Sequence, residues 1–65
     1  MEREIKNGLG MLIGKTSDVG NKVYAYDKYG VYKGHYDKYA DTTYDEYGSP
    51  VGMGDLTAAL ILKGE

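Results

Sequence analysis

The sequence predicts a mainly β (α+β) fold, an antiparallel meander of about four to five strands built from β-hairpin repeats with one short C-terminal helix. Three observations predict it. Glycine and tyrosine are abundant, at 10 and 8 of the 65 residues. A turn motif recurs along the chain, and the segments between its copies alternate side chains as half-buried strands do. An apolar segment that contains alanine follows the last copy.

The turn motif has two glycines separated by three residues. Its copies occupy residues 10–14, 30–34 and 48–52, and the last two share the lead-ins Tyr26-Asp-Lys-Tyr-Gly30 and Tyr44-Asp-Glu-Tyr-Gly48. An aspartate that accepts a hydrogen bond from the backbone two residues further on favours a type I turn. A left-handed glycine then closes the hairpin with a bulge. We therefore expect hairpins at Asp27 and Asp45.

A degenerate copy, Tyr36-Asp-Lys-Tyr-Ala40, has alanine where the other copies have glycine. Left-handed backbone is costly for alanine because of its Cβ atom. We expect this loop to be longer, running from Asp37 to Asp41.

The expected strands are residues 9–15, 22–26, 31–36, 42–44 and 49–53, and residues 16–21 are expected to form a loop. Alternation places Tyr24 and Tyr26 on one face of their strand, opposite Val23 and Ala25. It also places Tyr32 and Tyr36 on one face.

The ends of the pattern have their own signals. Pro50 marks the last strand as an edge strand because proline donates no ladder hydrogen bond. Asp55 is a favourable residue for starting a helix over residues 55–62, which would end near Gly64.

The repeated Tyr-Asp-x-x-Gly-x-x-x-Gly run resembles the small bacterial and phage domains described as β-flowers, in which hairpins with this turn chemistry are arranged around an axis. The resemblance covers residues 9–54 and implies a fold without implying an activity. In size and charge the chain is also similar to small phage-encoded inhibitors of host defence systems, including anti-CRISPR inhibitors.

Length and composition restrict the class of protein. We expect one domain over residues 1–65, with the hairpin repeats at 9–54. Cysteine is absent and His35 is the only histidine, so we expect no disulfide, no structural zinc and no cofactor. The N-terminus is charged and the longest apolar segment is short, so we expect a cytoplasmic protein without a membrane partner.

Catalysis and metal binding are not expected. His35 and Asp37 share one side of a strand, but no cysteine or neighbouring serine supplies a nucleophile and a small sheet encloses little volume. Asp37, Asp41 and Asp45 lie four residues apart, which does not match a calcium loop. The glycine motif also lacks the lysine and the following helix of a phosphate-binding loop.

Charge and aromatic content favour a binding role. Residues 1–36 contain six basic and four acidic residues, whereas residues 37–65 contain two basic and six acidic residues. The sequence has eight tyrosines and no Phe or Trp. Tyrosine without Phe or Trp is typical of surfaces that are partly buried and partly in contact with water.

We therefore expect a small protein-binding inhibitor, encoded by a phage or mobile element, that blocks a basic nucleic-acid-binding site of a host defence complex as a partial DNA mimic. The expected partner-binding residues are Tyr32, Tyr36, Asp37, Tyr39, Asp41, Tyr44, Asp45, Glu46 and Tyr47.

Two alternatives stay open at this point. One is a single-stranded nucleic-acid-binding module that uses a sheet face containing Tyr24, Tyr26, Tyr32 and Tyr36 beside Lys22, Lys28 and Lys33. The other is a structural homo-oligomer that assembles through the apolar segment from Leu56 to Leu62.

Overall fold

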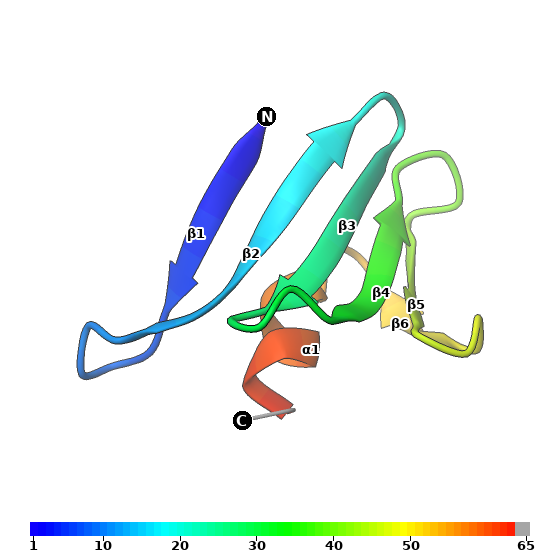
Figure 1. Cartoon of the computed structure of the whole chain (residues 1–65). Helices are drawn as coiled ribbons and strands as arrows, with labels where there is room; N and C mark the ends of the chain where they lie inside the picture. Colours follow the sequence, from blue (N-terminus) through cyan, green and yellow to red (C-terminus); the bar gives the residue numbers. More distant parts are fainter. Residues whose placement is uncertain (64–65) are drawn as a thin grey trace.

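The structure is a computed structural model that describes residues 1–63 (Figure 1). Six strands form one antiparallel sheet in sequence order, so each strand pairs with the next through a hairpin. The elements are β1 (Glu2–Lys6), β2 (Leu12–Val19), β3 (Lys22–Asp27), β4 (Tyr32–Asp37), β5 (Thr42–Asp45), β6 (Pro50–Met53) and α1 (Thr57–Lys63). The expected antiparallel meander with a short C-terminal helix is confirmed, and the described part of the chain has six strands instead of four to five.

The N-terminal half differs most from the expectation. Strand β1 was missed because four of its five residues are charged and its pattern shows no strand-like alternation. Residues 16–21, expected to be a loop, lie mostly in β2, which continues to Val19 before a tight turn at Gly20. Thr16 belongs to the strand because it pairs with Ala25 and its side chain is buried.

Three of the hairpin turns share one hydrogen-bonding arrangement. Oδ1 of Asp27 accepts hydrogen bonds from the backbone N–H groups of Tyr29 at 2.8 Å and Val31 at 2.9 Å. Asp45 repeats this arrangement in the β5–β6 turn and Asn7 in the β1–β2 turn. The fourth residue of each turn is a left-handed glycine, with φ of 77° at Gly10, 82° at Gly30 and 85° at Gly48. The hairpins expected at Asp27 and Asp45 are confirmed.

The degenerate copy forms the turn of residues 38–41 between β4 and β5, which has the same length as the turns of residues 28–31 and 46–49, instead of the longer loop that was expected. Oδ1 of Asp37 accepts from the N–H groups of Tyr39 and Ala40. The left-handed residue is Asp41, with φ of 50°, instead of Ala40. The residue with left-handed backbone in this turn is thus an aspartate, and aspartate tolerates this conformation better than alanine does.

The second glycine of each repeat adjoins a β-bulge. The sheet register shifts by one residue next to Gly14, Gly34 and Gly52. Gly14 and Gly34 face α1, because an added Cβ atom would lie 2.7 Å from Ile61 Cγ2 and from Leu60 Cδ1, respectively, and would also meet a carbonyl oxygen of the neighbouring strand. Gly52 faces Leu56, just before α1, whose Cδ1 would lie 2.9 Å from the added Cβ. The repeat therefore builds both a turn and a site for one side chain of the helical segment.

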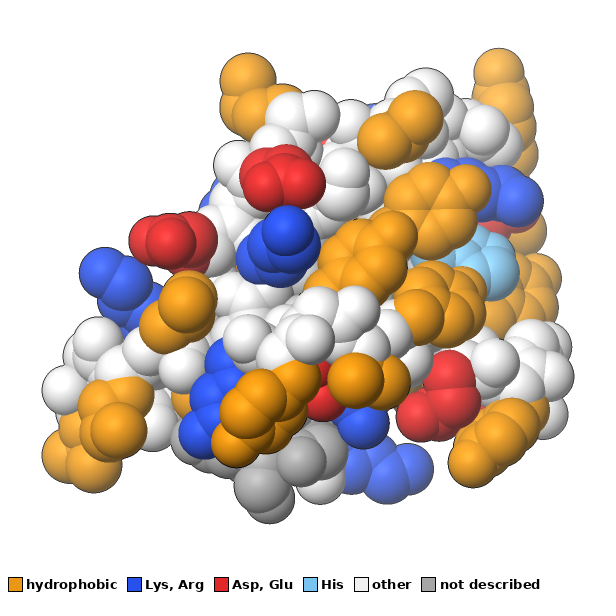
Figure 2. Space-filling view, viewed as in Figure 1, with side chains coloured by type: hydrophobic (Ala, Val, Ile, Leu, Met, Phe, Trp, Pro, Cys, Tyr) orange, Lys and Arg blue, Asp and Glu red, His pale blue; other side chains and the backbone are white. Residues whose placement is uncertain are grey.

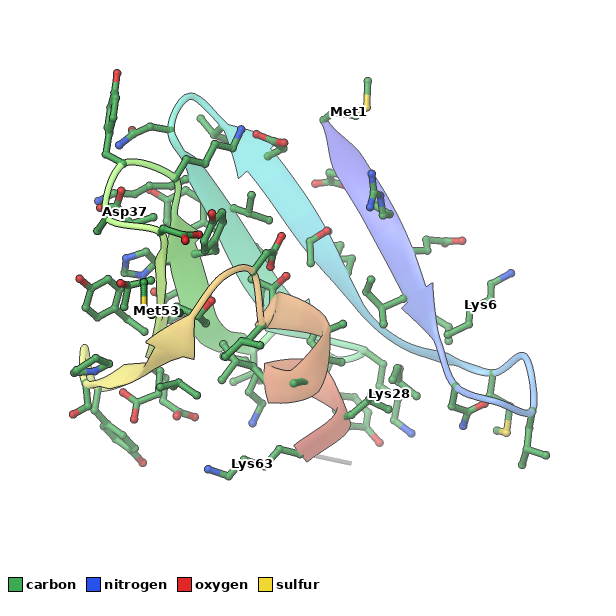
Figure 3. All side chains as sticks on the ribbon, turned by 180° about the vertical axis from the view of Figure 1, so that it is seen from behind. Met1, Lys6, Lys28, Asp37, Met53 and Lys63 are labelled. Carbon is green, nitrogen blue, oxygen red and sulfur yellow. The ribbon has the colours of Figure 1, made fainter. Side chains whose placement is uncertain are left out.

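The helix covers only one face of the sheet, where it packs against β2, β3 and β4 (Figure 3). Ile13, Ala25, Leu60 and Ile61 form the buried core, with Ile5 packed against them. No helix within residues 1–63 is both long and apolar enough to cross a membrane. The helix end expected near Gly64 lies outside the described residues.

Two hydrogen-bonding side chains position the start of the helix. The buried Thr43 hydroxyl donates to the carbonyl of Gly54 at 2.7 Å and accepts from the N–H of Leu56 at 2.9 Å. Oδ1 of Asp55 accepts from the N–H and the hydroxyl of Thr57. Asp55 therefore supports the helix start, as the sequence indicated.

We predict that Gly34→Ala lowers the free energy of unfolding by roughly 2–5 kcal/mol, because φ is +134° and the new Cβ would meet the Tyr44 carbonyl and Leu60. Urea denaturation measures this change. Gly8→Ala is the matched control, since nothing lies within 4 Å of its added Cβ, and it should change stability by about 0.5 kcal/mol or less. Equal midpoints for the two variants would contradict the close approach of the helix.

Candidate functional site

The sheet face opposite α1 has a group of aromatic side chains. Figure 2 shows them as adjoining orange rings beside the pale blue histidine. They come from three neighbouring strands, with Tyr24 and Tyr26 from β3, Tyr32 and His35 from β4, and Tyr44 from β5. We call these five residues the aromatic face. Cross-strand pairing of Tyr24 with His35, and of His35 with Tyr44, sets the rings side by side.

The rings of the aromatic face form a continuous row. His35 stacks on Tyr44 with ring centroids 5.2 Å apart and planes inclined by 25°. Further along, the centroids of Tyr24 and His35 are 6.0 Å apart, those of Tyr24 and Tyr32 6.5 Å, and those of Tyr26 and Tyr32 6.1 Å. Contacts in this range contribute about 0.5–1.5 kcal/mol each. These contacts therefore hold the rings of the row in place.

Hydroxyl groups line the row. The Tyr32 hydroxyl and Nδ1 of His35 share a hydrogen bond of 2.9 Å. Burial raises the pKa of Tyr32, and the nearby phenols of Tyr24 and Tyr26 raise it further, so Tyr32 keeps its proton. Within residues 1–63, the hydroxyls of Tyr24, Tyr26 and Tyr44 make no hydrogen bond.

Each lysine at the border of the aromatic face lies near a carboxylate. Lys15 lies opposite Tyr26 in the sheet, and its ammonium group is 3.6 Å from the carboxylate of Glu2. Lys22 lies opposite Asp37. Neither border therefore offers a surplus of positive charge.

Tyr36 does not belong to this face, so the expectation that it shares a face with Tyr32 was wrong. The bulge at Lys33 shifts the register, so that Tyr32 lies opposite Tyr26 while Gly34 lies opposite Ala25. The shift turns Tyr36 to the side that carries α1, where its hydroxyl donates a 2.7 Å hydrogen bond to Oδ1 of Asp41.

Two of the three lysines named for nucleic-acid binding have contacts other than the rings of the aromatic face. Lys33 is half-buried and its ammonium group lies 4.0 Å from the carboxylate of Asp27. The ammonium group of Lys28 lies 5.3 Å from the centre of the Tyr29 ring, at the β3–β4 turn. Lys22 alternates onto the same side of β3 as Tyr24 and lies opposite Asp37.

The acidic residues expected to bind a partner form two separate groups. Asp37 and Asp41 lie at the turn between β4 and β5, whereas Asp45 and Glu46 lie at the turn between β5 and β6 (Figure 1). Strand β5 separates the two groups. Asp37 and Asp45 also hold their turns, and Asp41 accepts from Tyr36.

The remaining expected residues are turn tips. Tyr39 is 89% exposed and Tyr47 is 87% exposed, and they lie at opposite ends of β5. Of the expected partner-binding residues, only Tyr32 and Tyr44 thus belong to the aromatic face. Alternation along the strand predicted that Tyr24 and Tyr26 share a face. The place of His35 in the row depends on the pairing register of β4 with its neighbours, which the sequence did not show.

Hollows elsewhere on the molecule have no evident chemistry. Two of them have a volume of about 370 Å³ each. One lies on the helix side between β1 and the start of α1, with Ile5, Val23 and Asp55 among its lining residues, and the other is lined by residues of β1, β2 and the β3–β4 turn. Among residues 1–63, no group of three or more His, Asp or Glu side chains could hold a metal ion.

Comparison with protein-family models, with curated proteins and with solved structures found no match to this chain. The aromatic face therefore has to be interpreted from its own geometry.

We predict that Asp41→Asn lowers the pKa of Tyr36. The hydrogen bond from the phenol to the Asp41 carboxylate raises that pKa above 10.0, because ionisation would break the bond and bring two negative charges together. A tyrosine pKa that folding raises contributes stability below about pH 10 that is lost as the pH rises further. Carbon-13 NMR of the Tyr36 ring, followed from pH 8 to 12, measures the shift.

The control for this titration is Asp45→Asn, which replaces a carboxylate at the other end of β5. It should leave the Tyr36 titration unchanged. A Tyr36 titration that is the same in wild type and in Asp41→Asn would contradict the assigned hydrogen bond.

Proposed function

We propose that this chain is a protein-binding module and that its aromatic face is the binding surface. The observation that carries the proposal is the continuous row of five rings on the side of the sheet opposite α1. Tyrosine supplies large contact area at low conformational-entropy cost, and its hydroxyl forms directional hydrogen bonds. Such residues dominate the binding energy of many protein interfaces.

Preorganisation supports the proposal. The rings contact one another, and the strands that bear them are fixed by hairpin turns and by α1 on the other face. A partner that docks on the rings would not have to order them first. Less ordering entropy is then lost on binding, which raises affinity for a given contact area.

Charge favours a protein partner over a nucleic acid. Affinity for nucleic acid depends mainly on neutralising phosphates. The lysines near the aromatic face are Lys15, which is paired with Glu2, and Lys22, which lies opposite Asp37. The chain as a whole has a formal net charge of −2.

The more specific form of the proposal, an inhibitor that mimics DNA with its acidic residues, has less support. Asp37 and Asp45 are engaged in turns, and Asp41 binds Tyr36. A mimic of nucleic acid would present its carboxylates to the partner on one surface, whereas these lie at two ends of β5. We therefore rest the proposal on the rings.

Photo-crosslinking tests the proposal. Tyr44 is replaced by p-benzoylphenylalanine, and the purified variant is irradiated in a lysate of the source cells. We expect one or a few defined protein adducts, because the benzophenone lies in the binding surface. Excess wild-type protein should compete with their formation, whereas excess of the Tyr24→Ala, His35→Ala double variant should compete at least tenfold less well.

The matched control carries the same photoreactive residue at Tyr39, which is exposed but lies at the β4–β5 turn, away from the row. Adducts formed from position 39 and not from position 44 would refute the assignment of the surface. Adducts with nucleic acid, together with salt-sensitive binding of a labelled single-stranded oligonucleotide, would favour the nucleic-acid alternative.

A further inference from the structure

We propose that the aromatic face recognises a proline-rich segment in the polyproline II conformation. This inference rests on the proposed protein-binding function and names the class of partner segment. The general precedent is chemical: proline-rich segments dock on exposed aromatic side chains of small domains, and their conformation is already formed before binding.

Hydrogen-bonding capacity favours such a ligand. The aromatic face offers the hydroxyls of Tyr24, Tyr26 and Tyr44, which make no hydrogen bond within residues 1–63. Backbone N–H and C=O groups of a sheet are directed to neighbouring strands, so the face itself presents side chains only. A proline residue has a backbone carbonyl that accepts hydrogen bonds and no N–H group that donates one. Tyrosine hydroxyls can donate to that carbonyl, so the ligand needs no backbone acceptor on the aromatic face.

The spacing of the rings also fits. Tyr24 and Tyr44 project from β3 and β5, which are two strands apart, or about 9.5 Å at the usual strand separation. A polyproline II helix advances about 9.3 Å in each three-residue turn. Residues i and i+3 of such a ligand can therefore rest on these two rings, with His35 between them.

Charge and local chemistry agree with this choice. Lys15 is paired with Glu2 and Lys22 lies opposite Asp37, so the face has no surplus of positive charge, which suits a ligand without acidic groups. The chain also has one proline of its own in a comparable place, since Pro50 lies opposite Tyr44 in the sheet.

Isothermal titration calorimetry tests the inference with a peptide of about ten prolines, which adopts the polyproline II conformation in water. A glycine-serine peptide of equal length is the flexible control. We expect saturable binding of the proline peptide and none of the control peptide. Tyr44→Leu should weaken binding at least tenfold, and Tyr44→Phe, which removes only the hydroxyl, should weaken it about threefold to tenfold.

Tyr39→Leu is the control variant, because its side chain lies outside the row, and it should bind like wild type. Circular dichroism establishes that each variant is folded. If the proline peptide does not bind while crosslinks from position 44 to a protein persist, the inference is overturned and the proposed function stands. If both are absent, both are overturned. Dimerisation that Tyr44→Leu abolishes would instead assign the face to a second copy of this chain.

Discussion

The close approach of α1 to the sheet is the constraint on which the rest of this structure depends. The chain from Leu56 to Ile61 places one side chain over each of three glycines, Gly14, Gly34 and Gly52. A Cβ atom there would collide with that side chain and, at Gly14 and Gly34, also with a carbonyl oxygen of the neighbouring strand. The buried core is small, so few other contacts compensate for a helix that is held further away. The glycine repeat is therefore a packing requirement as well as a turn signal.

This constraint also makes the two faces of the sheet different. On the helix side, Gly14, Ala25 and Gly34 are small where side chains of α1 fill the space above the strands. The other side has to be covered by the side chains of its own strands. Tyrosine suits that position because its ring shields the backbone while its hydroxyl stays in contact with water. The features that stabilise the fold and the rings proposed to bind a partner thus lie largely on opposite faces.

The features that could be predicted from the sequence are those that depend on residues close together in the chain. The turns at Asp27 and Asp45 and the apolar helix depend on residues close in sequence, and the structure confirms them. The direction of Tyr36 depends on the bulge beside Gly34, which is coupled to the distant Leu60. Strand β1 forms by pairing along β2 and not by a pattern of its own. Alternation within one segment contains no information on either of these long-range contacts.

The proposal that the aromatic face binds the partner is tested most directly by carbon-13 NMR of the tyrosine rings, recorded with and without the protein captured by crosslinking. Residues of the face and of the turn tips are then observed in one spectrum. The account predicts that the signals of Tyr24, Tyr26, Tyr32 and Tyr44 change on binding, while those of the exposed Tyr29, Tyr39 and Tyr47 do not. Changes confined to the three turn-tip tyrosines would contradict it.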